Sequence, residues 1–230
     1  MPPTAIEQGY HAARKLRKKL GLADSQPADP FWAAQQVNLI VARRPFSARN
    51  IAGLHLYRAE DDVAVAVINS TDPKARQRFT LAHEIAHDTF DREETIVDDL
   101  MDRESLKEIR ANCFAGEFLL PQAAIAQWKP KVQWADSPTD IAELAIYYGT
   151  SFEATLYRLV SAQCLNVDAV NSLKERRQEL SREIRTRISE REEEETILPP
   201  EFVALAKEAL AKHIISRRKY DELVRGFVEK

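Results

Sequence analysis

The sequence predicts an α+β protein in which helices pack on a small, mostly antiparallel sheet and an all-α region follows. Two observations predict this class. The strand patterns gather in residues 39–70, and the segments on either side have the spacing and stop signals of helices. A chain of 230 residues can hold one substantial core and a smaller second unit.

The N-terminal part is predicted to be helical. Residues 4–20 are rich in Ala, Lys, Arg and Leu at helical spacing, and Gly21 ends that helix. The turn-forming stretch SQPADPF (25–31) then leads into a short helix that ends near Asn38.

Three strands are predicted next, at LIVARRPF (39–46), IAGLHLYR (51–58) and VAVAVINS (63–70). The polar AEDD (59–62) between the second and the third is short, so these two are expected to form an antiparallel hairpin. Pro45 favours an edge or an end for the first strand.

Helices are predicted for most of the remaining chain. One runs from about Lys74 to Phe90, and a second covers 105–120 and stops at Pro121. Two short helices flank a turn at Gly149 within residues 141–160.

The last third of the chain is highly charged. Residues 174–195 are predicted to form one solvated helix with a thin apolar stripe at Leu180, Ile184 and Ile188. A helical hairpin is expected over 201–229, after the break at LPPEF.

Composition limits the class of protein. A net charge of -3 does not favour a dedicated nucleic-acid binder. The two cysteines, Cys113 and Cys164, do not make a disulfide framework and are expected to be reduced core residues. The N-terminus lacks the apolar run of a signal peptide, and the longest apolar run, VAVAVI (63–68), is too short for a bilayer. A cytoplasmic protein is therefore expected.

The stretch TLAHEIAHDTF (80–90) contains the residues that suggest chemistry. His83 and His87 are four apart, so on a helix they lie on one face and can bind one metal ion. Zinc accepts imidazole ligands readily, and manganese or iron could use the same ligands. Glu84 lies about 100° around the helix from His83, which suits a general base that takes a proton from water rather than a ligand.

A chance occurrence of the five-residue pattern is the competing interpretation. The apolar residues around the two histidines favour a built site over chance, because they predict a buried, amphipathic helix. These residues are Phe79, Leu81, Ala82, Ile85 and Ala86.

A third protein ligand is needed, because two histidines leave a zinc site too open. The next helix offers Glu108 and Glu117, which are nine positions apart and face opposite ways, so only one can reach the metal. Glu108 is preferred because it shares its face with Asn112. That amide could accept a hydrogen bond from the far nitrogen of a ligand histidine.

Two motifs together resemble the ImmA/IrrE family of zinc metallopeptidases. They are RFTLAHEIAH (78–87) and EIRANCFAGEFLLP (108–121). The resemblance covers roughly residues 5–170. It implies a minimal zincin-like, gluzincin-like domain with zinc held by His83, His87 and a glutamate. Other zincins with a similar second helix use its first glutamate, which supports Glu108.

The chain is expected to have three parts. Residues 1–135 would form the zinc metallopeptidase domain, and residues 136–170 a helix-turn-helix-like segment. Residues 171–230 would form a charged helical C-terminal region.

The chain departs from the family pattern at two positions. Many relatives have a histidine where this chain has Asp91, and an acidic residue where it has Arg110. Neither residue is an expected ligand, so we interpret both as changes at the rim of the cleft.

The resemblance implies a role in transcription regulation and stress response. Family members commonly act on helix-turn-helix repressors encoded beside them. The expected activity is a zinc-dependent endopeptidase that cleaves such a partner and relieves repression. The alternative is a non-cleaving, zinc-binding regulator that sequesters a transcription factor or acts in a toxin–antitoxin pair. Glu84 favours the enzyme, since a scaffold needs no base there.

Other candidates have structural alternatives. Tyr147, Tyr148 or His55 could stabilise an oxyanion, but each is more typical of a core residue. In the helical pair 141–160, the second helix offers only Arg158 as a basic side chain, so direct DNA binding is not favoured over a structural or partner-binding role.

Substrate binding is expected at a strand. In zincins a strand beside the metal helix pairs with the extended substrate, and the candidate here is Val63–Asn69 as an edge strand. Proline at Val65 or Val67 is then expected to weaken cleavage without removing zinc.

Overall fold

The computed structural model describes residues 3–46, 51–92, 96–99, 105–128, 133–134, 137–189, 196–197 and 200–224. In chain order the elements are α1 (Ala5–Lys19), α2 (Pro30–Gln36), β1 (Leu39–Arg44), β2 (Ile51–Arg58), β3 (Val63–Asn69), α3 (Lys74–Phe90), β4 (Ile96–Asp99), α4 (Leu106–Leu119), α5 (Gln122–Gln127), α6 (Pro138–Tyr148), α7 (Phe152–Ser161), α8 (Val167–Glu175), the 3-10 helix η2 (Arg176–Glu179), α9 (Arg182–Ser189), β5 (Thr196–Ile197), α10 (Pro200–Ala211) and α11 (Arg217–Val224). The predicted α+β class is confirmed.

The sheet has the strand order β4-β2-β3-β1-β5. The pairs are antiparallel except for β1 with β3, and the predicted hairpin of β2 and β3 is confirmed. The expectation that β3 is an edge strand is wrong. Val65 lies between Ile40 of β1 and Leu56 of β2, so β3 is paired on both sides. The edge on the hairpin side is β4.

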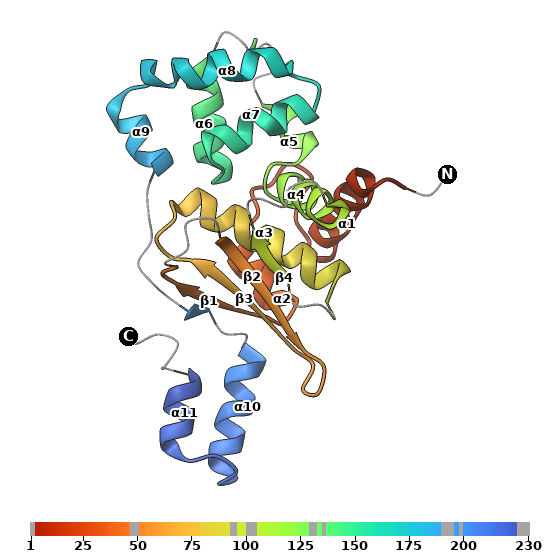
Figure 1. Ribbon diagram of the computed structural model, residues 1–230, viewed down its shortest axis with the longest axis vertical. Helices are drawn as coiled ribbons and strands as arrows, with labels where there is room; N and C mark the ends of the chain where they lie inside the picture. Colours follow the sequence, from red (N-terminus) through yellow and green to blue (C-terminus); the bar gives the residue numbers. More distant parts are fainter. Residues whose placement is uncertain are drawn as a thin grey trace.

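Helix α3 is the centre of the first core. It lies across β2 and β3, α4 lies beside it, and α1 lies beside α4 (Figure 1). Every residue from Thr80 to Asp88 is buried, because the sheet and the neighbouring helices surround this part of α3. The first core also includes Leu39, Ile68, Leu81 and Phe114.

A second core lies in the helices that follow α4. It is built around Ile141, Leu144, Phe152, Leu156 and Leu159, with η2 and α9 contributing through Leu180 and Ile184. The helices α5 to α9 form a layer above the sheet in Figure 1, whereas α10 and α11 lie below it. The domain boundaries at 135 and 170 stay predictions.

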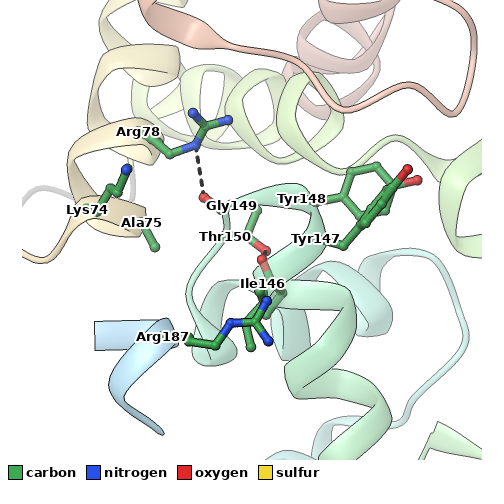
Figure 2. A pocket seen from close by; sticks show the side chains of 10 residues that line it. Lys74, Ala75, Arg78, Ile146, Tyr147, Tyr148, Gly149, Thr150 and Arg187 are labelled. Carbon is green, nitrogen blue, oxygen red and sulfur yellow. Dashed lines mark hydrogen bonds between the residues drawn. The ribbon is translucent and has the colours of Figure 1, made fainter. Parts of the chain in front are cut away.

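Arg78 joins the two cores. Its Nε donates to the Gly149 carbonyl at 3.2 Å, and its Nη2 donates to the Ala28 carbonyl at 2.7 Å. Gly149 has a φ of 65°, and a side chain there would collide with the Arg78 guanidinium. Figure 2 shows this contact beside a cavity of about 340 Å³. The cavity is lined by Lys74, Ala75, Arg78, Ala145, Ile146, Tyr147, Tyr148, Gly149, Thr150 and Arg187.

The continuous helix predicted over 174–195 is wrong. The chain turns at Leu180, which has an extended backbone and is buried in the second core, and Ser181 then caps α9 by accepting from the Ile184 amide. Residues 190–195 lie outside the described part. The sequence interpretation also missed β4, α5, α8 and β5, none of which is longer than nine residues.

Two further expectations were tested. Both cysteines are free, but neither is a fully buried core residue: Cys113 is partly buried in α4, and Cys164 is exposed in the turn after α7. Within the described segments, no helix combines the length and the apolar character needed to cross a membrane.

Candidate metal centre

The turn before α3 fixes where the HEIAH segment begins. Asn69 ends β3, and its side-chain oxygen accepts hydrogen bonds from the Thr71 amide at 3.1 Å and the Phe46 amide at 3.2 Å. The Gln77 side chain donates to the carbonyls of Ser70 and Asp72. These contacts tie the first turns of α3 to the strand end, so the histidines two turns later have a fixed depth in the core.

The helix α4 carries the third candidate ligand in its first turn. Ser105 caps this helix, and its hydroxyl accepts from the Glu108 amide at 3.2 Å. The chain leaves the helix at Leu120, just before Pro121, as the sequence predicts. Since α3 and α4 pack side by side, this cap places the Glu108 carboxylate opposite the histidines.

Three polar groups converge between α3 and α4. The Nε2 atoms of His83 and His87 are 2.9 Å apart, and the Glu108 carboxylate lies 3.1 Å from the first and 3.3 Å from the second. All three side chains are buried, and one ligand atom from each lies within 4.8 Å of the others.

These separations fit a bound metal. Tetrahedral ligands with bonds of about 2.0–2.1 Å lie about 3.3–3.4 Å from one another, close to the observed spacing. Two imidazole nitrogens and a carboxylate are also donors that zinc prefers. His83, His87 and Glu108 could therefore hold a metal ion, with small adjustments.

The far nitrogens of both histidines have acceptors. The His83 Nδ1 lies 3.1 Å from Asn112 Oδ1, so the expectation for Asn112 agrees with the structure. The His87 Nδ1 lies 3.2 Å from Asp91 Oδ2. Each acceptor favours a proton on Nδ1, so Nε2, which faces Glu108, is the nitrogen that a metal would use.

The histidines also shift the ionisation of Glu108. Burial alone would raise the pKa of this carboxyl, but hydrogen bonds from His83 and His87 and their charges lower it from 4.5 to about 2. The group is thus an anion throughout the physiological range, which a metal ligand requires.

Glu84 lies fully buried, and Gly53 of β2 lies against its carboxylate. A Cβ on Gly53 would overlap Glu84 Oε1 and would lie 2.6 Å from Thr80 Cγ2. A side chain at this position would force Glu84 or Thr80 to move, so β2 forms a wall for the predicted base. No pattern in the sequence distinguished Gly53 from an ordinary strand glycine.

Glu117, the alternative third ligand, has different partners. Its Oε1 accepts from Arg14 Nε at 2.8 Å, and its Oε2 pairs with Arg158. The structure thus brings Glu108, and not Glu117, together with the histidines. The ligand roles themselves stay predictions.

The structure places Arg110 against Asp91 and Asp91 against His87, two contacts that the sequence interpretation did not include, and the assignment to the rim of the cleft stays a prediction. Asp91 is buried, and its Oδ1 lies 2.6 Å from Arg110 Nη2 while Oδ2 reaches His87. No local signal in the sequence indicates this pair, because 19 positions separate its two residues.

The other candidates have structural partners. The Tyr148 hydroxyl donates to the Ser25 carbonyl at 2.8 Å, whereas Tyr147 is exposed beside the cavity of Figure 2. His55 is buried with its Nε2 3.4 Å from Asp88 Oδ1. Arg158, the basic residue of α7, is buried in its ion pair with Glu117.

Comparison with known proteins gives one family. A model of the Peptidase M78 family, described as the IrrE N-terminal-like domain, matches residues 34–160. This is more than half of the chain, and it includes α3 and α4 with the whole cluster. Among curated proteins, none matches the chain.

Proposed function

Since the chain belongs to the Peptidase M78 family of IrrE N-terminal-like metallopeptidase domains, we propose that it is a zinc-dependent endopeptidase acting on a protein partner. The family supports a metallopeptidase. The observation that supports the finer assignment is the buried cluster of His83, His87 and Glu108 with Glu84 on the same helix.

The metal would be held by His83 and His87 from α3 and by Glu108 from α4. Zinc bound by such ligands supplies a Lewis acid that polarises a carbonyl and makes a water more acidic. The two helices hold these ligands before any metal binds, because the Ser105 cap, Asn112 and Asp91 fix their orientation.

Glu84 serves as the general base in this proposal. Its carboxylate accepts the proton of the attacking water and then delivers it to the amine of the departing chain. Burial beside Gly53 limits its motion, so the base keeps one position through both transfers. A pure scaffold has no use for a carboxylate held in this way, which favours the enzyme over the non-cleaving regulator.

The substrate is proposed to be an extended segment of a folded partner. Its backbone would pair with the outer edge of β4, because β4 ends the sheet next to β2 and β2 contacts α3. This replaces the expected role of β3, whose two sides are already paired.

The partner is proposed to be a helix-turn-helix repressor encoded nearby, whose cleavage relieves repression. This rests on the family resemblance. The buried Arg158 in α7 supports a protein partner over direct DNA contact, because α7 then offers no accessible basic side chain among its described residues.

One experiment tests the proposal. The zinc-loaded protein is mixed with the repressor from the adjacent gene, and the products are identified by mass spectrometry. A single cut is expected, and it should disappear with a chelator. The Glu84→Gln variant should keep zinc and fold but cleave at least 10²–10⁴-fold more slowly.

Two outcomes would contradict it. If Glu84→Gln cleaves at the wild-type rate, Glu84 is not the base. If the wild-type protein relieves repression in a reporter strain without producing any fragment, the non-cleaving regulator is correct.

A further inference from the structure

The two histidines of the cluster differ in what lies behind them. His83 has a neutral amide, Asn112, on its far side, whereas His87 has the carboxylate of Asp91. Asp91 ends α3, and its own amide donates to the His87 carbonyl at 2.7 Å. The carboxylate and the imidazole are therefore held in one short turn of backbone.

Arg110 reaches Asp91 from the other helix. It lies on α4 two residues after Glu108, and its Nη2 is 2.6 Å from Asp91 Oδ1. The guanidinium also lies 4.3 Å from the centre of the Phe90 ring, and its Nη1 contacts Gln8 of α1 at 3.4 Å. Three neighbours thus fix this side chain, which is only 18% exposed.

We propose that Asp91 and Arg110 form a positioning pair that sets the orientation of His87 and locks α3 to α4 at the metal centre. This inference rests on the proposed function, since it concerns the same cluster. Neither residue is one of the three candidate ligands or the predicted base. Each acts through His87: Arg110 binds the Asp91 carboxylate, and that carboxylate accepts a hydrogen bond from His87 Nδ1.

The geometry explains why both members are needed. Asp91 has two oxygens with one task each: Oδ2 accepts from His87 and Oδ1 binds Arg110. Without Arg110, the carboxylate could rotate, and the imidazole would lose its fixed acceptor. Without Asp91, the Arg110 cation would lie close to a histidine that must remain neutral to bind metal.

Zinc affinity tests the pair, measured by competition with a chromophoric chelator at neutral pH. Arg110→Gln should raise the Kd about 10–100-fold, because it frees the Asp91 carboxylate and so disturbs the acceptor of His87, and loss of such an acceptor usually has an effect of this size. Arg110→Lys should lose less zinc affinity than Arg110→Gln, because lysine keeps the positive charge. Asp91→Asn should also weaken zinc binding. The double variant should have a Kd no higher than that of the single variant that binds zinc less tightly, as expected for two residues that act together.

A matched control removes an arginine from the same end of α3. Arg92 follows Asp91, but its ion-pair partners are Asp62 and Asp88. Arg92→Gln should bind zinc within about twofold of wild type. If Arg110→Gln and Arg92→Gln lower affinity equally, general charge explains the effect and the positioning pair is refuted.

A second measurement needs no variant. In the zinc-loaded wild-type protein, nitrogen NMR of the His87 ring should show a protonated, slowly exchanging Nδ1 and a metal-bound Nε2. Metal on Nδ1, or the absence of a proton there, would overturn the inference. Failure of the wild-type protein to bind zinc, in contrast, would refute the proposed function itself.

Discussion

Replacing Gly53 with alanine should separate metal binding from catalysis. The substitution adds one carbon, and that carbon would overlap Glu84 Oε1 and lie 2.6 Å from Thr80 Cγ2. Carbon atoms in contact are normally about 3.5–4.0 Å apart, so the groups must separate by roughly 1 Å. The Glu84 side chain is the part that can rotate, because β2 is paired on both sides.

A shift of this size should reduce the rate strongly. A general base must lie within about 2.6–3.2 Å of the proton it takes, and a misplacement of about 1 Å can cost about 10²-fold. We therefore expect kcat for cleavage of the repressor to fall about 100-fold. Zinc content should stay at one per chain, because the three atoms nearest to the added carbon belong to Glu84 and Thr80 and not to His83, His87 or Glu108.

The assay compares cleavage rate, zinc content and Tm of this variant with those of Gly116→Ala. At Gly116 a Cβ meets its nearest atom, Arg158 Cδ, at 3.4 Å, and the residue lies in a helix, so alanine should be tolerated there. Wild-type cleavage by a folded, zinc-loaded Gly53→Ala protein would show that the position of Glu84 does not limit the reaction.

Three further predictions concern the ligands, the sheet and acid. Glu108→Ala should abolish stoichiometric zinc binding, whereas Glu117→Ala should retain zinc but lose about 3–5 kcal/mol of stability, because it leaves Arg158 buried without its partner. The opposite result in metal analysis would transfer the ligand role to Glu117. Proline at Val65 should lower Tm and the folded fraction, rather than affect cleavage alone, because β3 is an interior strand. A stable, zinc-loaded Val65→Pro protein with impaired cleavage would restore β3 as the substrate platform. Since the pKa of Glu108 is lowered from 4.5 to about 2, its ionised form stabilises the folded apoprotein above about pH 4.5, and that contribution is lost as pH falls toward 2. The Tm difference between wild type and Glu108→Gln, both in chelator, should narrow over that interval, and a constant difference would contradict the assignment.

The sequence indicated local features well. The bounds of α3, Lys74–Phe90, and the hairpin of β2 and β3 follow from hydrophobic period and turn chemistry, which depend on near neighbours. The convergence of Glu108 with the histidines was also expected, since it needs only the face of one helix against another.

Contacts between residues that are far apart in the chain could not be predicted from the sequence. The parallel contact of β1 with β3 makes β3 an interior strand, but the alternation in VAVAVIN is the same for an edge and an interior position. The Asp91–Arg110 pair joins two helices, and the close approach of Gly53 to Glu84 depends on how β2 crosses α3. Neither leaves a local pattern.

The two-residue strand β5 has a consequence for how the protein can be shortened. The chain leaves the sheet after β4, builds the helices α4 to α9, and then returns so that Thr196 and Ile197 pair with Ala42 and Val41 of β1. A fragment that ends at residue 170, where the family resemblance ends, would uncover that side of β1. Exposed strand edges of this kind attract other chains, so such a fragment is expected to self-associate, whereas one that ends after Ile197 keeps the edge covered.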